Sequence, residues 1–258
     1  MVTRFPILTF HAVDDRPSVI SFSPALFQRS MARLYRHGYR TVGLRELAGC
    51  LRRGSSFLER SFVITFDDGY RSVYDEAFPI LQRLGFSATV FLSVGQNSER
   101  ADSTRLPSMC ERPMLSWREI KEMHRWGFEF GGHTLTHPDL TRLPAELLEA
   151  EVVGSKEIIQ DALGAAVDTF AYPFGRYDNR CRALVSRHFL CACSDRLGLL
   201  HKTSDAYAME RVDSYYLRNL SLFSMIHTRI FPFYIRARAI PRQVRRAVAP
   251  YINKQVCL

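Results

Sequence analysis

Two adjacent carboxylates, Asp67 and Asp68, follow an apolar run at residues 62–66 and precede Gly69. Such a run is typical of a buried strand in a parallel sheet, and α/β folds keep their ligand sites at the carboxyl ends of these strands. Neighbouring carboxylates repel each other and lose hydration on burial, which favours a cation between them. Asp-Asp-Gly is also common in turns and helix caps, so the pair alone leaves both interpretations open.

A second polar cluster contains His133 and His137 and follows a strand-like segment at residues 128–130. Two imidazoles four residues apart can face one ion from a helical turn or a tight loop. The pair alone is weak evidence, and Thr134 stands where an H-E-x-x-H protease has glutamate. A strand-terminal aspartate at the same rim strengthens it, since two imidazoles and one carboxylate leave coordination positions for water and substrate. The sequence therefore predicts a catalytic site for a divalent metal.

Strand-like and helix-like segments alternate from residue 7 to about residue 212 and would position these side chains. Alternation of this kind predicts an α/β fold, a (β/α) barrel of seven or eight units. The polar, proline-containing stretch 96–114 predicts a long loop on the active-site face that contributes to specificity. We expect helices at 23–37, 44–53, 72–84, 116–127, 145–163 and 179–188, and strands at 7–10, 39–42, 62–66, 88–92, 128–130, 169–172, 190–194 and near Val212.

The composition is that of an ordinary soluble protein, with 47% hydrophobic and 24% charged residues among 258. The chain has no apolar run of about 18 residues and no secretory signal at its N-terminus. We therefore expect a cytoplasmic location. The six cysteines lack paired metal-ligand spacing, and Cys191 and Cys193 are expected as buried thiols on a strand.

The net charge of +9 is concentrated at the C-terminus. From Arg218 onward the chain has eight basic and no acidic residues, whereas 27 basic and 26 acidic residues precede it. We expect one catalytic domain at residues 1–217 and a basic, aromatic extension at residues 218–258. The extension is compatible with structural cover for the barrel, with contact to an anionic membrane surface and, least favoured, with nucleic-acid binding.

Three segments together resemble the motifs of one enzyme family. Thr65-Phe66-Asp67-Asp68-Gly69, the stretch His133 to Pro138, and Phe170-Ala171-Tyr172-Pro173-Phe174-Gly175 are similar in order and spacing to motifs of the polysaccharide deacetylases, the NodB-homology or carbohydrate esterase family 4 enzymes. The resemblance covers roughly residues 5–215. It implies a distorted (β/α) barrel that removes N-acetyl groups from amino sugars with one divalent metal, most commonly zinc, with cobalt, nickel or manganese as alternatives.

The resemblance also implies roles for individual residues. Asp68, His133 and His137 would hold the metal, and Asp67 would be the general base. The backbone N–H of Tyr172 would stabilise the oxyanion. Tyr172 and Pro173 would lie beside the substrate.

Two departures from the family pattern concern the acid and the brace of the base. The usual late histidine motif is represented only by His227, whereas the segment around His11 resembles the opening motif of a permuted subgroup that includes poly-N-acetylglucosamine deacetylases. In that subgroup an early histidine is the acid, so we favour His11. Ala171 replaces the arginine that braces the catalytic aspartate in many relatives, and Arg176 or Arg211 are candidate substitutes.

The function expected from these residues is metal-dependent N-deacetylation of a sugar in glycan or glycoconjugate biosynthesis. A cytoplasmic location favours a lipid-linked or nucleotide-linked substrate and permits attachment to the inner face of the membrane. The alternatives are a non-catalytic carbohydrate-binding member of the fold, or a hydrolase of another C–N bond or of an O-acetyl ester.

Overall fold

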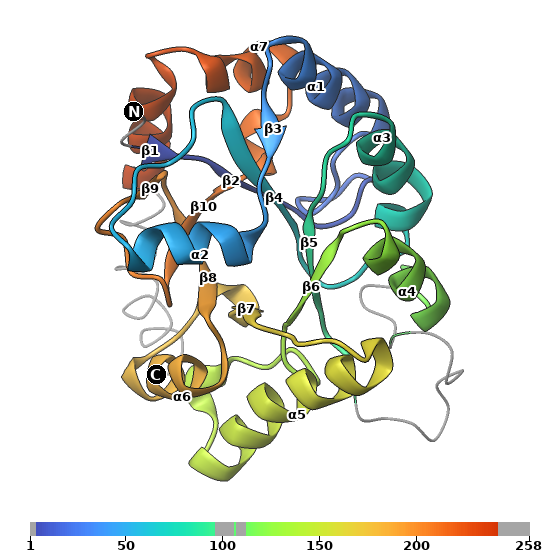
Figure 1. Ribbon diagram of the computed structural model, residues 1–258, viewed down its shortest axis with the longest axis vertical. Coiled ribbons are helices and arrows are strands. Elements are labelled where there is room, and N and C mark those ends of the chain that lie inside the picture. The colour runs from blue at the N-terminus through green and yellow to red at the C-terminus, as the bar shows by residue number, and fades with distance from the viewer. Residues whose placement is uncertain (1–3, 96–105, 107–111, 242–258) are drawn as a thin grey trace, which may run out of the picture.

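Seven parallel strands close into a barrel in the computed structural model, which describes residues 4–95, 106 and 112–241 (Figure 1). Around the ring their order is β2, β4, β5, β6, β7, β8 and β10, and β10 pairs with β2 to close it. The predicted (β/α) barrel is confirmed, with seven units. The strands are β2 (Ile7–Phe10), β4 (Ser61–Phe66), β5 (Thr89–Leu92), β6 (Glu129–Gly132), β7 (Thr169–Ala171), β8 (Cys191–Leu197) and β10 (Met209–Asp213).

Three short strands of the described residues lie outside this ring. The strand predicted at 39–42 is β3 (Arg40–Thr41), which pairs only with the first two residues of β4. Strand β1 (Arg4–Phe5) pairs antiparallel with β9 (Leu200–His201). Segments of two residues bury too little surface to complete an eighth barrel unit.

Helices cover the outside of the barrel, and most begin and end at the predicted residues. Ser116 and Glu119 form the expected capping box. The C-cap of the longest helix is Gly164, which adopts the left-handed conformation (φ 64°) that glycine accepts without steric cost. The helices are α1 (Pro24–Arg36), α2 (Leu44–Arg52), α3 (Phe78–Arg83), α4 (Trp117–Arg125), α5 (Ala145–Leu163) and α6 (Asn179–His188).

The helix predicted at 72–84 is interrupted. It begins as a π-helical turn, Val73–Ala77, and continues as α3. Pro79 lies at the start of α3 and has no N–H to donate to the preceding turn, so the regular helical hydrogen bonds cannot continue through it.

Two apolar clusters form the core of the part of the chain that the structure describes. The larger lies between the barrel and its helices, and the smaller includes inward-facing residues such as Ile7, Val63 and Phe91. Cys191 and Cys193 belong to the smaller cluster as buried free thiols, as predicted.

The described part of the C-terminal extension packs on the barrel. It contains α7 (Leu220–Phe223) and a helical segment at residues 231–241, and it buries Phe223, Phe231 and Ile235 in the larger cluster. Among the described residues, no helix combines the length and apolar character that a membrane span requires. The rest of the extension, and most of the predicted 96–114 loop, lie outside the described residues.

Candidate active site

A pocket of about 430 Å³ lies at the carboxyl ends of the barrel strands. Because all seven strands are parallel, the residues that follow them gather at one rim. The chain thereby brings residues from six separate stretches of the sequence into one pocket, among them His11, Asp67, His133 and Arg211.

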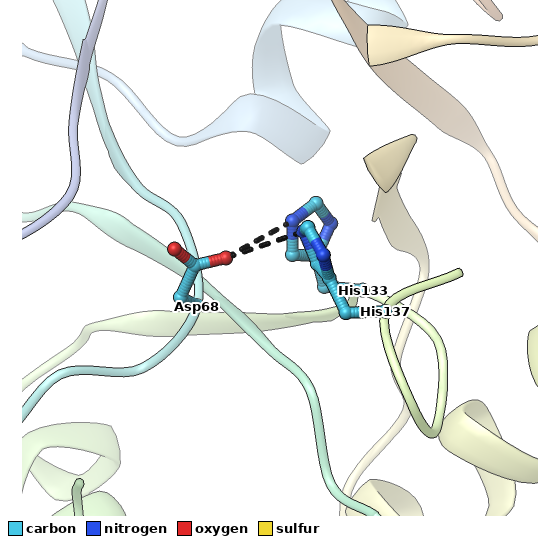
Figure 2. A group of neighbouring side chains, drawn as sticks. All are labelled: Asp68, His133 and His137. Atoms are coloured by element: carbon cyan, nitrogen blue, oxygen red, sulfur yellow. Dashed lines mark ion pairs between the residues drawn. The ribbon is translucent and has the colours of Figure 1, made fainter. Parts of the chain in front are cut away.

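Asp68, His133 and His137 form one cluster in this pocket, shown in Figure 2. Their candidate ligand atoms all lie within 4.8 Å of one another. The Nε2 atoms of His133 and His137 are 3.4 and 3.5 Å from Asp68 Oδ1. The geometry therefore presents two imidazole nitrogens and one carboxylate oxygen to a common point.

The chemistry of this cluster fits a divalent cation. Asp68 Oδ1 is buried and has no hydrogen-bond partner among the described residues. His133 Nδ1 lies 2.7 Å from the Ala171 carbonyl, which can only accept a hydrogen bond, so the Nε2 of a neutral ring turns a lone pair toward the carboxylate. Burial lowers the pKa of His137 to about 4, with a further contribution from His133, so its ring is neutral at neutral pH. Lone pairs directed at one another in a buried site are the donor set that zinc and similar ions bind.

The loop between the two histidines is anchored by Glu151 of α5. Its carboxylate accepts the backbone N–H groups of Leu135 and Thr136 at 2.8 and 2.9 Å. Thr134 and His137 both have left-handed backbone conformations (φ 71° and 58°), as does Asp68 (φ 74°). A left-handed conformation costs free energy in residues other than glycine and persists only where surrounding contacts stabilise it. The contacts of this loop therefore hold His137 in one position.

Asp67 makes a bidentate ion pair with Arg211. Both Asp67 carboxylate oxygens accept guanidinium N–H groups at 2.7 Å, and both side chains are buried. Arg211 Nε donates to the Ser194 carbonyl at 2.9 Å, which fixes the guanidinium in place. The other predicted brace, Arg176, instead pairs with Asp139 at 2.7 Å on the exposed side of the pocket. The interpretation of Arg176 as a brace for Asp67 is therefore wrong.

The Asp67 carboxylate is kept ionised by these contacts. Burial raises its pKa, but the charge and hydrogen bonds of Arg211 outweigh burial and lower the pKa below its ordinary value. An ionised carboxylate beside a candidate metal site is the state that a general base requires.

His11 and His227 lie in different parts of the molecule. His11 follows β2, lines the pocket, and places Nε2 at 4.0 Å from Asp67 Oδ2. Its side chain is partly exposed, so it can reach a bound molecule. His227 stacks on His37 with ring centroids 4.2 Å apart and lines other pockets.

Tyr172 contributes its side chain to the pocket, but its backbone N–H donates to the Cys193 carbonyl at 3.1 Å. The assignment of this N–H as the oxyanion donor is therefore wrong, because the pairing of β7 with β8 uses it. Pro173 is buried and is not among the residues that line the pocket.

Sequence reasoning missed several residues of the pocket wall. Phe174 is 56% exposed, and its ring centroid lies 4.6 Å from that of His137. Asp195 and Asp213 add two carboxylates from β8 and β10. Gly175 accommodates Asp195, since a Cβ at this position would lie only 2.1 Å from Asp195 Oδ1. An aspartate within a buried strand was the one available signal for Asp195.

Comparison with known proteins agrees with this geometry. The family model for polysaccharide deacetylase matches residues 55–190, more than half of the chain. The chain belongs to the polysaccharide deacetylase family. The matched region contains Asp67, Asp68, His133 and His137, whereas His11 and Arg211 lie outside it.

Individual deacetylases are similar over longer stretches. The Bacillus subtilis protein YxkH, which carries the polysaccharide deacetylase name, is 26% identical over 210 residues, covering 81% of this chain and 71% of that protein. A Staphylococcus aureus poly-beta-1,6-N-acetyl-D-glucosamine N-deacetylase is 28% identical over 164 residues, which cover 60% of this chain and 54% of the relative. The Streptococcus pyogenes deacetylase PplD, solved with acetate, shares the fold, with a TM-score of 0.72 at 24% identity over 81% of this chain and 92% of PplD.

Proposed function

We propose that this deacetylase is a metal-dependent hydrolase that removes an N-acetyl group from an amino sugar. The observation that carries the proposal is the adjacency of two different carboxylates, Asp68 in the metal-ligand cluster and Asp67 in an ion pair with Arg211. A site that only binds a carbohydrate needs neither a metal-ligand set nor a base held in the ionised state.

The proposed metal ligands are Asp68, His133 and His137, with zinc as the first candidate and cobalt, nickel and manganese as alternatives. A divalent ion held there supplies a Lewis acid that polarises the amide carbonyl and makes water more acidic. Three protein ligands would be the open donor set of a catalytic metal site rather than the closed set of a structural one.

Asp67 is the proposed general base. Its carboxylate accepts a proton from the water that attacks the acetyl carbon. Arg211 holds both Asp67 oxygens at 2.7 Å, so the base keeps one orientation and its negative charge in a buried site.

His11 is the proposed general acid. When the C–N bond breaks, the amine nitrogen takes the electron pair and needs a proton, which His11 donates. The products are acetate and the free amino sugar. His11 lies at the pocket wall near Asp67, whereas His227 lines other pockets, so His11 is the better candidate for the acid.

The substrate class is inferred from relatives. The Staphylococcus aureus relative is named for poly-beta-1,6-N-acetyl-D-glucosamine, so an oligomeric N-acetylglucosamine is one candidate substrate. A lipid-linked or nucleotide-linked N-acetyl sugar, as expected for a cytoplasmic protein, is the other. The cytoplasmic location and the assignment to the permuted subgroup stay predictions from the sequence.

Acetate release tests the proposal. The zinc-loaded protein should release acetate, with a matching mass loss, from at least one of a panel of oligomeric, nucleotide-linked and lipid-linked N-acetyl sugars. An Asp67→Asn variant is the control for contaminating activity. Binding of the panel without acetate release would instead support a non-catalytic carbohydrate-binding protein, and acetate release only from O-acetyl esters would support an esterase.

A further inference from the structure

A second pocket, of about 630 Å³, lies at the amino ends of the barrel strands. Its wall includes Ser61, the first residue of β4, and Arg4 of β1. The reaction pocket lies at the carboxyl ends of the same strands. Since β4 spans six residues, or about 20 Å, the two pockets are at opposite ends of the barrel.

The charged and imidazole side chains that line this second pocket are mostly basic. Arg4, Arg60, Arg229 and His227 line it together with one carboxylate, that of Glu59. An adjoining pocket shares Arg60 and His227 and adds two further basic side chains, Arg36 and His37. His227 Nδ1 is buried without a hydrogen-bond partner among the described residues. Guanidinium and imidazole N–H groups at this density are typical of sites that bind phosphate oxygens.

The helical segment at residues 231–241 continues from the wall of this pocket and has an exposed apolar stripe. Phe231 and Ile235, each 2% exposed, point into the core. On the opposite side, Phe233 is 71% exposed and Ile240 is 57% exposed. They are seven residues, or two helical turns, apart and so lie on one face. Ile230, just before the segment, is 63% exposed.

Positive charge accompanies this apolar stripe. Arg236 lies between Phe233 and Ile240 on the exposed face, and Arg229 precedes the segment. Between residues 218 and 241 the chain has four arginines and no acidic residue. A surface that exposes large apolar side chains between arginines is complementary to a surface that is both apolar and negatively charged.

We propose that the face formed by Arg229, Ile230, Phe233, Arg236 and Ile240 docks on an anionic phospholipid membrane. Phe233 and Ile240 enter the interfacial layer, and lipid phosphates contact Arg60, Arg229 and Arg236.

Vesicle co-sedimentation of the full chain tests the docking surface. The protein should bind phosphatidylcholine vesicles that contain phosphatidylglycerol, should bind pure phosphatidylcholine weakly, and should be released by high salt. Phe233→Ala should weaken partitioning on the order of tenfold. Arg236→Glu changes the charge by two units and should weaken it about 30-fold.

Two matched variants control for general effects of exposed side chains. Trp126→Ala removes a 62% exposed aromatic ring from the end of α4, and Arg187→Glu reverses an exposed charge on α6. Neither should change vesicle binding. Melting curves of all four variants check that each one is folded.

Three results would overturn the docking proposal. Equal binding to neutral and anionic vesicles would show that lipid charge does not contribute to binding. Equal losses of vesicle binding in the control variants would show that binding does not depend on this face. A concentration-dependent dimer that dissociates in Phe233→Ala, without vesicle binding, would identify a second copy of the chain as the occupant. Acetate release from a soluble substrate should be the same for wild type and Phe233→Ala, so failure of docking is distinguishable from failure of the deacetylase assignment.

Discussion

Replacing Arg211 with methionine should expose how much the Asp67 base depends on its partner. The change keeps an unbranched side chain but leaves the Asp67 carboxylate buried without its two hydrogen bonds of 2.7 Å. Removing one member of a buried ion pair costs about 3–5 kcal/mol of unfolding free energy, since the remaining charge stays desolvated. Both side chains are at most 5% exposed, so solvent screens this loss little. We expect a loss of this size in urea unfolding at neutral pH.

The pH dependence of activity should change in the same variant. In the wild type the pKa of Asp67 is lowered, so Asp67 contributes stability above the pKa of an unfolded aspartate and loses it as the pH falls through the lower folded value. Without Arg211, burial raises the pKa of Asp67 and part of the base is protonated at a higher pH. The acid limb of kcat/KM for acetate release should therefore move to higher pH.

A double variant and a control separate charge from packing. Combining Arg211→Met with Asp67→Asn removes both charges, so the double variant should be less destabilised than the sum of the two single variants. Arg176→Ala breaks the pair with Asp139, in which the arginine is 57% exposed, and should cost at most about 1 kcal/mol without moving the acid limb. Stability of Arg211→Met within about 1 kcal/mol of wild type, together with an unchanged acid limb, would refute the reasoning.

Three other changes test separate parts of the account. His11→Ala should lower the rate of acetate release about 10²–10⁴-fold while His124→Ala, on α4, leaves it unchanged; equal rates for both variants would exclude His11 as the acid. Glu151→Ala leaves two N–H groups of the His137 loop without their acceptor and should weaken zinc affinity about tenfold in a competition titration, and an unchanged affinity would argue against that anchoring role. Asp178→Ala removes the N-cap bond to the Cys181 N–H and should cost about 1 kcal/mol or less at neutral pH. That bond holds the pKa of Asp178 at about 2, so its contribution to stability is present above about pH 4 and is lost as the pH falls through 2. Melting temperatures of variant and wild type that stayed different in acid would contradict this.

The sequence predicted those parts of the site that depend on local patterns. Asp67 and Asp68 follow an apolar run that predicts a buried strand. The histidine pair follows a second strand-like segment. The parallel alternation of strands and helices then requires both to lie at one rim. The position of His11 was predicted in the same way, because His11 follows the parallel strand β2 and therefore lies at that rim.

Interactions between distant strands could not be predicted in this way. Nothing near Arg211 or Arg176 in the sequence indicates which one meets Asp67, because that depends on β10 closing the barrel between β8 and β2. The N–H of Tyr172 was assigned incorrectly for a related reason. Its partner, the Cys193 carbonyl, is determined by the register of β7 against β8.

The central claim is that Asp68 holds a metal ion and Asp67 does not. The most direct measurement is the metal content of purified wild type, Asp67→Asn and Asp68→Ala after loading with zinc and desalting, with acetate release measured on the same samples. We expect about one ion per chain in the wild type and in Asp67→Asn, none in Asp68→Ala, and activity only in the wild type. Acetate release from metal-free wild type, or loss of the ion from Asp67→Asn as complete as from Asp68→Ala, would contradict it.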